Sequence, residues 1–371
     1  MSQSIPDKEV PSGLSEGIAK CSVTCPMCGN RHVQYRLNPQ LYWFTDMDID
    51  LKPTGFHCRK SLEGYYPRLY ELWHCPQCHF TAHNRVFPDP LKHVYIEKGL
   101  MARRLAEFKK ANPGMVRITE ALAEGMSFEN TNFPQAIRQS LLDIYYQRLI
   151  IDVLNQGHDQ LARGFLRLAW LFRDWKEMQP DRAEEEKRLN GVLDLVIQDW
   201  PDCPRSENEA LDAACRCFSL ALERSKSPDP VESCGMMAQM ARIRVKMGDL
   251  DAAQQLLGEC QRSIVTEVEN ISRAMTEDLH LGKLGEEERG RLLSDSRKLR
   301  SLLDECRALN ESIAKKNAES DRKRAEELIA SNSKASPDSI RKLLVDKGIS
   351  APIIRELLPE RKGGLFGGLF K

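Results

Sequence analysis

The sequence predicts a mainly α-helical protein: a small zinc-ribbon-like β module at the N-terminus, followed by an α-helical, tetratricopeptide-like repeat solenoid. Two C-x-x-C pairs, separated by the 46 residues from 29 to 74, predict a metal-binding module. Between these pairs the chain is aromatic and alternating, which favours short strands. Beyond residue 90, apolar residues recur at intervals of three and four, and proline or glycine separates the runs, as in consecutive helices.

Composition limits the class of protein. With 371 residues the chain is long enough for two or three domains. Lys plus Arg and Asp plus Glu both number 54, so net charge gives no argument for nucleic acid or an acidic membrane. Twelve cysteines are too few for a disulfide scaffold of this length, and a reducing cytoplasm is expected. No secretory signal and no apolar run of ~20 residues is present, so we expect no transmembrane segment.

Each C-x-x-C pair has the local chemistry of a zinc knuckle. The two motifs are Cys25-Pro26-Met27-Cys28-Gly29 and Cys75-Pro76-Gln77-Cys78-His79. Two residues between cysteines let one tight turn aim both sulfurs at a single ion and direct backbone N–H groups at the thiolates. The four cysteines therefore predict a closed, structural Zn²⁺ site. Gly29 suits the positive φ that ends such a turn, and His79 takes the equivalent position.

The long spacer and nearby polar residues raise further hypotheses. A compact ribbon has roughly 15 to 20 residues between its pairs, so we expect an inserted loop or hairpin. A thiol redox pair is an alternative, but no βαβ pattern accompanies these motifs. His57, Cys58 and His83 are candidates for a second or accessory metal site. The acidic run from Asp46 to Asp50 can be considered for a hard cation, although such residues are more often solvated or cap turns.

The aromatic residues of the spacer permit two interpretations. Tyr42 to Phe44 and Tyr65 to Trp73 suit strands that pack over a small metal site. Alternatively, exposed aromatic rings beside cations can stack on single-stranded bases. The basic residues of this segment are Arg31, Arg36, Lys52, Arg59, Lys60 and Arg68.

Helices are expected over most of the remaining chain. The predicted helical segments are approximately 91–108, 137–153, 161–172, 182–200, 207–224 and 231–247, and Pro113-Gly114 marks the end of the first run. Around residues 237–264, small residues recur where paired helices approach, a pattern similar to a tetratricopeptide repeat. These positions are Ala241, Gly248, Ala253, Leu257 and Cys260. Such helices would stack into a short solenoid with a concave binding face.

The C-terminal third is charge-rich. Over residues 286–330, the heptad positions are held by Leu292, Leu299, Leu302, Cys306, Leu309 and Ile313. This short repeat favours a solenoid-capping helix or a helical hairpin over a long coiled coil. Ser336-Pro337 and Ser350 then predict the starts of two short helices. In the repeated Gly-Gly-Leu-Phe tail, Leu365, Phe366, Leu369 and Phe370 are candidates for docking to a partner.

These observations give a predicted organisation. It comprises a leader (1–20), a zinc-ribbon-like module (21–88), a tetratricopeptide-like helical domain (89–282), a long charged helix (283–330), a linker with two short helices (331–362) and a flexible Gly-Leu-Phe tail (363–371).

Several of these motifs together resemble one bacterial family. They are the first knuckle, the run Asp46 to Asp50, the stretch Tyr70 to Cys78, and the later Leu166 to Arg173 with its Ala-Trp-Leu-Phe-Arg sequence. The chain is similar to domain of unknown function 2225 over approximately residues 20 to 270. The resemblance implies two C-P-x-C knuckles, tetratricopeptide-like helices and a bacterial cytoplasmic setting, and it implies no activity. His79 departs from the glycine usual there.

The sequence contains no nucleophile motif, phosphate-cradling glycine loop or H-E-x-x-H helix. Our first hypothesis is therefore a non-enzymatic cytoplasmic adaptor or scaffold that binds a protein through its helical repeats and its tail. The alternative is a nucleic-acid-binding or transcription-linked regulator acting through the zinc ribbon. A third hypothesis is a zinc-dependent enzyme that uses His57, Cys58 or His83.

Overall fold

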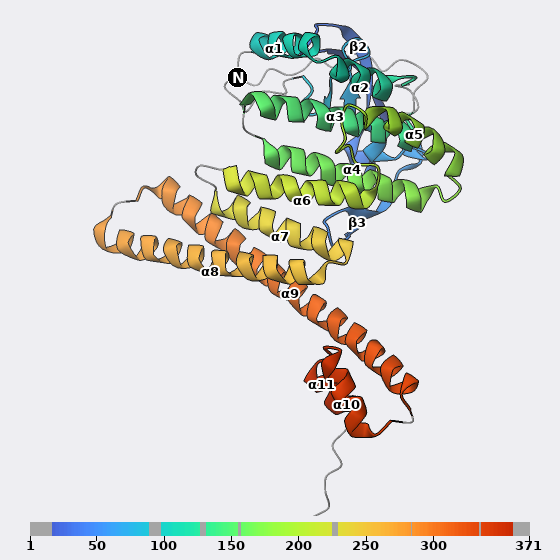
Figure 1. The fold of residues 1–371 in the computed structure, drawn as a ribbon. Coiled ribbons are helices and arrows are strands. Elements are labelled where there is room, and N and C mark those ends of the chain that lie inside the picture. The colour runs from blue at the N-terminus through green and yellow to red at the C-terminus, as the bar shows by residue number, and fades with distance from the viewer. Residues whose placement is uncertain are drawn as a thin grey trace, which may run out of the picture. The chain divides into compact units, whose positions relative to one another are not determined.

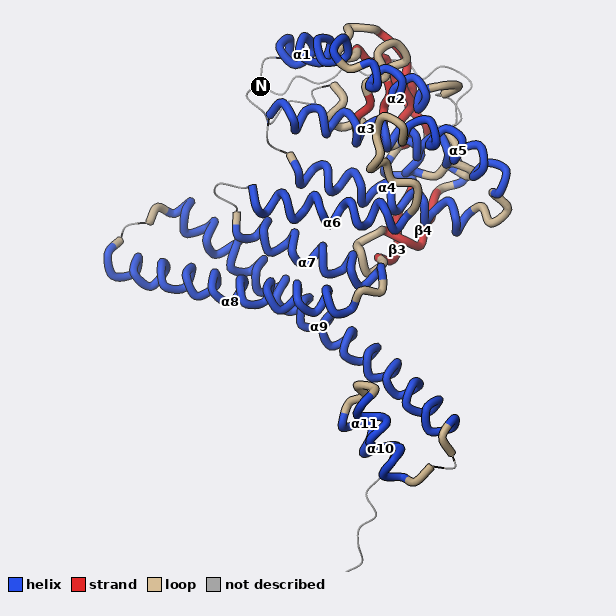
Figure 2. Tube along the Cα trace, in the orientation of Figure 1, coloured by secondary structure: helices blue, strands red, loops and turns tan. Residues whose placement is uncertain are grey.

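The structure is a computed structural model that describes residues 17–88, 98–126, 131–154, 157–224, 229–282, 284–333 and 335–358. Its backbone contacts divide the chain into two compact units, Met1–Asp249 and Leu250–Lys371. Helices dominate both units, and the strands of the described residues lie in the N-terminal part of the first unit (Figures 1 and 2). The prediction of a mainly α-helical protein with a small N-terminal β module is confirmed.

The strands of the described residues form three antiparallel pairs. They are β1 (Ile18–Thr24) with β2 (Arg31–Leu37), β3 (Tyr42–Met47) with β4 (Pro53–Cys58), and β5 (Leu72–His74) with β6 (Thr81–His83). Short 3-10 helices at Pro39–Leu41, Lys60–Leu62 and Pro67–Tyr70 connect them. The first and third hairpins carry the cysteine pairs, and the middle hairpin is the insertion expected between them.

The helices of the first unit overlap the predicted segments, and α2 is an additional helix that was not among them. They are α1 (Lys98–Ala111), α2 (Pro113–Ala123), α3 (Phe133–Leu154), α4 (His158–Met178), α5 (Ala183–Val196), α6 (Glu207–Arg224) and α7 (Pro230–Met247). Pro113 begins α2 instead of only ending the preceding helix. Proline suits this first turn because its fixed φ is helical and an N–H there would have no partner within the helix.

The order in which these helices pack differs from a simple tandem stack. Helix α4 packs between α3 and α6, and α6 packs on α7. Helix α5 leaves this layer and packs on α2. In a tetratricopeptide-like array each helix pairs with the next one in sequence. Because α4 pairs with α6 across α5, the predicted solenoid is not confirmed.

The second unit contains a long helical hairpin. Helices α8 (Leu250–Leu281) and α9 (Glu286–Ser331) pack together, and the short connection between them makes them antiparallel (Figure 1). Three heptad residues of α9, Leu299, Cys306 and Ile313, are at most 1% exposed. Their spacing of seven places them on one stripe of the helix. The expectation of a helical hairpin is confirmed.

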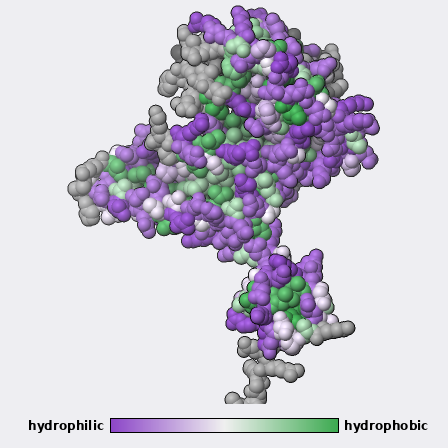
Figure 3. All heavy atoms as spheres, viewed as in Figure 1, coloured by the Kyte–Doolittle hydropathy of each residue, from purple (hydrophilic) through white to green (hydrophobic). Residues whose placement is uncertain are grey.

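The end of α9 packs with two short helices, α10 (Pro337–Asp346) and α11 (Ala351–Leu357). The Ser336 hydroxyl accepts a hydrogen bond from the Ser339 amide, which confirms the predicted N-cap. The core of this cluster consists of Ala325, Ile340, Leu344, Ile349, Ile353 and Ile354. Figure 3 shows apolar side chains gathered on the face of α10 and α11 that it displays.

The tail residues Leu365, Phe366, Leu369 and Phe370 lie outside the described residues, as do residues 1–16 of the leader. Within the part of the chain that the structure describes, no helix is both long and apolar enough to cross a membrane.

Candidate metal centre

Each cysteine pair lies in the turn of a β-hairpin. In the turn from β1 to β2, the Cys25 amide donates to the Asn30 carbonyl and the Gly29 amide donates to the Cys25 carbonyl, both at 2.9 Å. The turn from β5 to β6 repeats these two bonds from the amides of Cys75 and His79, at 2.8 and 2.9 Å. The two knuckles therefore share one backbone conformation, although Cys75 lies 47 positions after Cys28.

The residue that ends each knuckle has the predicted left-handed conformation. Gly29 has φ 76° and His79 has φ 63°. A positive φ is unusual for a residue with a Cβ atom. The His79 ring stacks on His74 with a centroid distance of 5.5 Å. The departure from glycine at this position leaves the turn geometry intact.

The two knuckles bring their sulfurs to one point. The sulfurs of Cys25, Cys28, Cys75 and Cys78 all lie within 4.8 Å of one another. Two closest pairs, Cys25 with Cys78 and Cys28 with Cys75, are each 3.5 Å apart and each join one hairpin to the other. In a tetrahedral site with Zn–S bonds of 2.3 Å, sulfurs are about 3.8 Å apart. The donor set therefore fits a four-coordinate metal ion.

Backbone amides and neighbouring thiols form hydrogen bonds with these sulfurs. The Met27 amide donates to the Cys25 sulfur at 3.4 Å, and the Gln77 and Cys78 amides donate to the Cys75 sulfur. Without a cation, the hydrogen bond with the Cys75 side chain raises the pKa of the Cys25 thiol. A divalent cation would replace the protons that the thiols share, because thiolates are the ligands of such ions.

Two helices hold the second knuckle from outside. Tyr146 on α3 and Lys109 on α1 both donate to the Cys78 carbonyl, at 2.7 and 2.8 Å. The Tyr146 ring also packs edge-on against Phe80, with a centroid distance of 5.4 Å. If the four cysteines bound a divalent ion as thiolates, their charge would exceed that of the ion, and Lys109 would place a positive charge beside them. Sequence reasoning missed both residues because neither lies within 30 residues of the cysteines.

His57, Cys58 and His83 are not members of the cysteine cluster. Within the described ranges, the four cysteines are the one group of three or more potential ligands at metal-binding spacing. His57 stacks on Trp43 with a centroid distance of 5.8 Å. Cys58 packs against an apolar cluster within the β-module. The His83 Nδ1 atom accepts a hydrogen bond from the Arg85 amide at 3.2 Å.

The acidic run between β3 and β4 is held by cations of the helical layer. The Asp50 side chain is fully buried, and Arg173 on α4 donates to both its oxygens at 3.1 and 2.7 Å. Trp170 adds a third bond at 3.0 Å. Asp48 pairs with Arg173 at 2.8 Å and with Lys246 on α7 at 2.7 Å. Asp50 is thus paired with a guanidinium instead of being solvated. Asp48 and Asp50 also accept hydrogen bonds from the amides of Ile49 and Lys52, as expected for residues that cap a turn.

A second buried ion group lies next to the first. Asp174 accepts from Lys52 at 2.6 Å, from Arg68 at 2.8 Å and from the Tyr66 hydroxyl at 2.8 Å. The Lys52 and Arg68 side chains are 2% and 6% exposed, so neither is available to phosphate groups. We call the set Asp48, Asp50, Lys52, Arg68, Arg173 and Asp174 the hairpin anchor. It fixes the β3–β4 hairpin to α4.

The comparison with protein families matches residues 18–278 to the family described as "Uncharacterized protein conserved in bacteria (DUF2225)". The chain belongs to this family. The matched range contains both knuckles and the whole hairpin anchor. No curated protein and no solved structure matches the chain. Membership of the DUF2225 family confirms the resemblance and assigns no activity.

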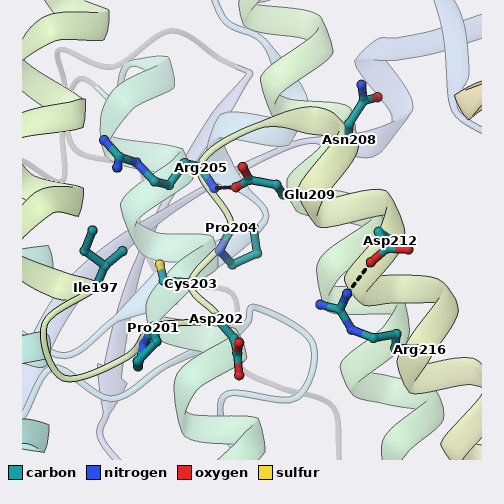
Figure 4. Close-up of a pocket in the computed structure, with 10 residues that line it drawn as sticks. All are labelled: Ile197, Pro201, Asp202, Cys203, Pro204, Arg205, Asn208, Glu209, Asp212 and Arg216. Carbon is teal, nitrogen blue, oxygen red and sulfur yellow. Dashed lines mark hydrogen bonds and ion pairs between the residues drawn. The ribbon is translucent and has the colours of Figure 1, made fainter.

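A surface hollow of this DUF2225 protein lies beside α6 (Figure 4). Its lining residues are Ile197, Pro201, Asp202, Cys203, Pro204, Arg205, Asn208, Glu209, Asp212 and Arg216. The Arg205 amide donates to Glu209 at 2.7 Å, and Arg216 pairs with Asp212, so these groups satisfy one another. Burial raises the pKa of the Cys203 thiol to about 12. The thiol is therefore protonated at neutral pH and is a poor nucleophile.

His83 predicts a pH dependence of stability. Burial, with the Arg167 and Arg85 charges, lowers its pKa from 6.5 to about 4. The folded state keeps the ring neutral between these values, whereas the unfolded chain binds a proton. The contribution of His83 to the free energy of unfolding is therefore full above about pH 6.5 and is lost as the pH falls towards 4. Allowing for the partial exposure of the ring, we expect about 1–2 kcal/mol to be lost between pH 7 and pH 5.

Urea unfolding at both pH values measures this effect. His83→Asn keeps an acceptor for the Arg85 amide and removes the titration. We expect its free energy of unfolding to fall by about 1–2 kcal/mol less than that of the wild type over the same pH interval. Equal losses in the two proteins would exclude His83 as the source. Any loss of stability that comes from protonation of the cysteines affects both proteins, so the difference between wild type and His83→Asn at each pH removes it.

Proposed function

We propose that the protein is a non-enzymatic cytoplasmic adaptor, in which structural Zn²⁺ stabilises the N-terminal module and the helical layer supports a protein-binding surface. The observation that carries this proposal is the closed donor set of four cysteine sulfurs within 4.8 Å. Four thiolates fill the tetrahedral positions of Zn²⁺ and leave none for a substrate or a catalytic water. This donor set favours a structural role over the zinc-enzyme hypothesis.

Zn²⁺ bound here would cross-link two hairpins of two strands each, and an isolated two-stranded hairpin is only marginally stable. The cysteines would hold the ion, while Lys109 and Tyr146 would position the second knuckle through the Cys78 carbonyl. Small metal sites supply folding free energy in this way to modules that cannot bury enough apolar surface.

The outer face of the β3–β4 hairpin is our candidate for the partner surface. Trp43 and Met47 are 50% and 63% exposed. Trp43 pairs with His57 and Met47 with Pro53 in the strand register, so these four residues share one face. We call it the outer hairpin face. Large aromatic and methionine side chains that a rigid element holds open to solvent are typical of protein-binding surfaces.

Two features favour a preformed surface. The hairpin anchor fixes the turn between β3 and β4 to α4, so little order has to be gained on binding. Gly55, at φ 63°, lies between the pairs that form the outer hairpin face. A Cβ atom there would lie 2.2 Å from the Thr45 hydroxyl, so glycine allows the two strands to remain in register.

Nucleic-acid binding or transcription-linked regulation remains the alternative proposal. Trp43 can stack on a base, and four of the six basic residues, Arg31, Arg36, Arg59 and Lys60, are exposed. The other two are neutralised in the hairpin anchor. The cationic surface is therefore smaller than the sequence alone suggests, which favours a protein partner.

Affinity capture tests the adaptor proposal. We expect the immobilised full chain to recover a defined bacterial protein and Trp43→Ser to recover roughly fivefold less or worse, as for an interface hot spot. Leu195→Ser, which removes a side chain that is 57% exposed on α5, serves as the matched control and should bind normally. A chain lacking residues 363–371 tests the tail, and metal content is measured on every protein.

The outcomes separate the two proposals. Equal capture by Trp43→Ser and the wild type would remove the outer hairpin face from the proposal. Absence of any reproducible protein partner would count against the adaptor. Binding of an oligonucleotide that weakens steeply with salt and is lost in the double variant Arg59→Glu, Lys60→Glu would support the alternative instead.

A further inference from the structure

Two cysteines outside the metal centre face each other across the α8–α9 hairpin. The Cys260 sulfur on α8 lies 3.8 Å from the Cys306 sulfur on α9. Both residues are reduced, and they are 0% and 1% exposed. Because both belong to the second compact unit, their approach is a property of this hairpin alone.

The neighbouring core keeps these sulfurs in register. Leu257 and Ile264 on α8, and Leu299 and Ile313 on α9, are all completely buried. The residues on α9 lie seven positions before and after Cys306, so the helix presents all three on one stripe. A disulfide requires an S–S distance of about 2.05 Å, so the sulfurs need to approach by less than about 2 Å. Side-chain rotation with a small helix shift can supply this movement.

We propose that Cys260 and Cys306 form an oxidation-sensitive pair that closes a disulfide between α8 and α9, with a peroxide as the oxidant. One thiolate attacks the peroxide O–O bond, which gives a sulfenic acid and releases water from hydrogen peroxide once a proton is taken up. The second thiolate then attacks the sulfenic sulfur and displaces hydroxide, which leaves as water. Two thiols and one hydrogen peroxide thus give one disulfide and two waters.

The burial of the pair determines when the reaction occurs and what it changes. Peroxide reaches these sulfurs during local opening of the helix pair. Once formed, the bond links residues 46 positions apart and opposes further opening, because it restricts the open ensemble. Oxidation would therefore make the α8–α9 hairpin more rigid without requiring any change in the metal centre.

Mass spectrometry tests whether the bond forms. The full-length, metal-loaded protein is treated with hydrogen peroxide and digested with trypsin without reduction. Cleavage after Lys246, Arg262, Arg300 and Arg307 isolates Cys260 in peptide 247–262 and Cys306 in peptide 301–307. We expect these two peptides to be linked in the wild type and in the control Cys217→Ala. They should not be linked in Cys260→Ala or Cys306→Ala, and a thiol reductant should separate them.

Hydrogen exchange tests the consequence. We expect oxidation to slow exchange of the α8 and α9 amides at least about tenfold in the wild type, since the bond opposes opening. The double variant Cys260→Ala, Cys306→Ala should show no such slowing. The proposal is overturned if no linked peptide forms even in urea that opens the hairpin mildly, or if the double variant responds like the wild type. If one single variant fails to fold, the other provides the same comparison.

Discussion

Removing the metal is expected to unfold the two cysteine-bearing hairpins and to leave most of the helices folded. Structural zinc sites in small modules contribute about 10–16 kcal/mol of apparent binding free energy, which becomes folding free energy. Cys75 is completely buried among the four sulfurs. Chelation, or the substitution Cys75→Ser, should therefore remove metal and hydrogen-exchange protection from residues 20–85, with little loss of helical circular dichroism.

The structure sharpens this expectation within the module. The β3–β4 hairpin is held by the hairpin anchor, whose contacts need no metal. We therefore expect residues 48–58 to retain more protection after chelation than β1, β2, β5 and β6. Cys21→Ser, at a half-buried cysteine on β1 that is not among the four, serves as the control and should keep the metal. Full protection of all three hairpins in metal-free protein would contradict a structural role for the metal.

What the sequence could predict was local. The C-x-x-C spacing fixes a turn within five residues, so the pairing of cysteines within each knuckle and the positive φ of His79 followed from the motif. Helix α6 coincides with its predicted range because apolar periodicity and flanking prolines act over a few turns. The burial of Cys306 on the α8–α9 hairpin likewise followed from heptad spacing.

What it could not predict depends on partners far apart in the chain. Asp50 and Arg173 are 123 residues apart, and an aspartate beside other aspartates in a loop is ordinarily solvated. The residues adjacent to Asp50 in the sequence do not indicate that an arginine will pair with it. The packing of α4 on α6, with α5 between them only in sequence, was unpredictable for the same reason. Helical periodicity identifies the buried face of a helix but not the helix that covers it. The pair Trp170 and Arg173, three residues apart on α4, was the one feature of the sequence that could have suggested a polar partner for this helix.

Replacing Arg173 by methionine is expected to cost about 3–5 kcal/mol of unfolding free energy, because it leaves Asp50 as an unpaired buried charge. The Asp50 side chain has no exposed surface, and Arg173 supplies both of its ion-pair contacts. Arg173 also pairs with Glu207 at 2.7 Å, so the variant would loosen α6 as well. Urea unfolding followed by tryptophan fluorescence measures the loss, and Trp170, bonded to Asp50, lies at the site of the change.

Two comparisons show whether the charge itself is responsible. Arg117→Met removes an ion pair with Asp199 at the surface and should change stability little, because solvent screens such pairs. Adding Asp50→Asn to Arg173→Met should recover part of the loss, since an amide is less costly to bury without a cation. A loss in Arg173→Met as small as that in Arg117→Met would exclude the hairpin anchor as a stabilising element. If the hairpin anchor also preforms the outer hairpin face, Arg173→Met should reduce partner capture while the metal content stays unchanged. This result would show that the anchor, and not the metal, supports that surface.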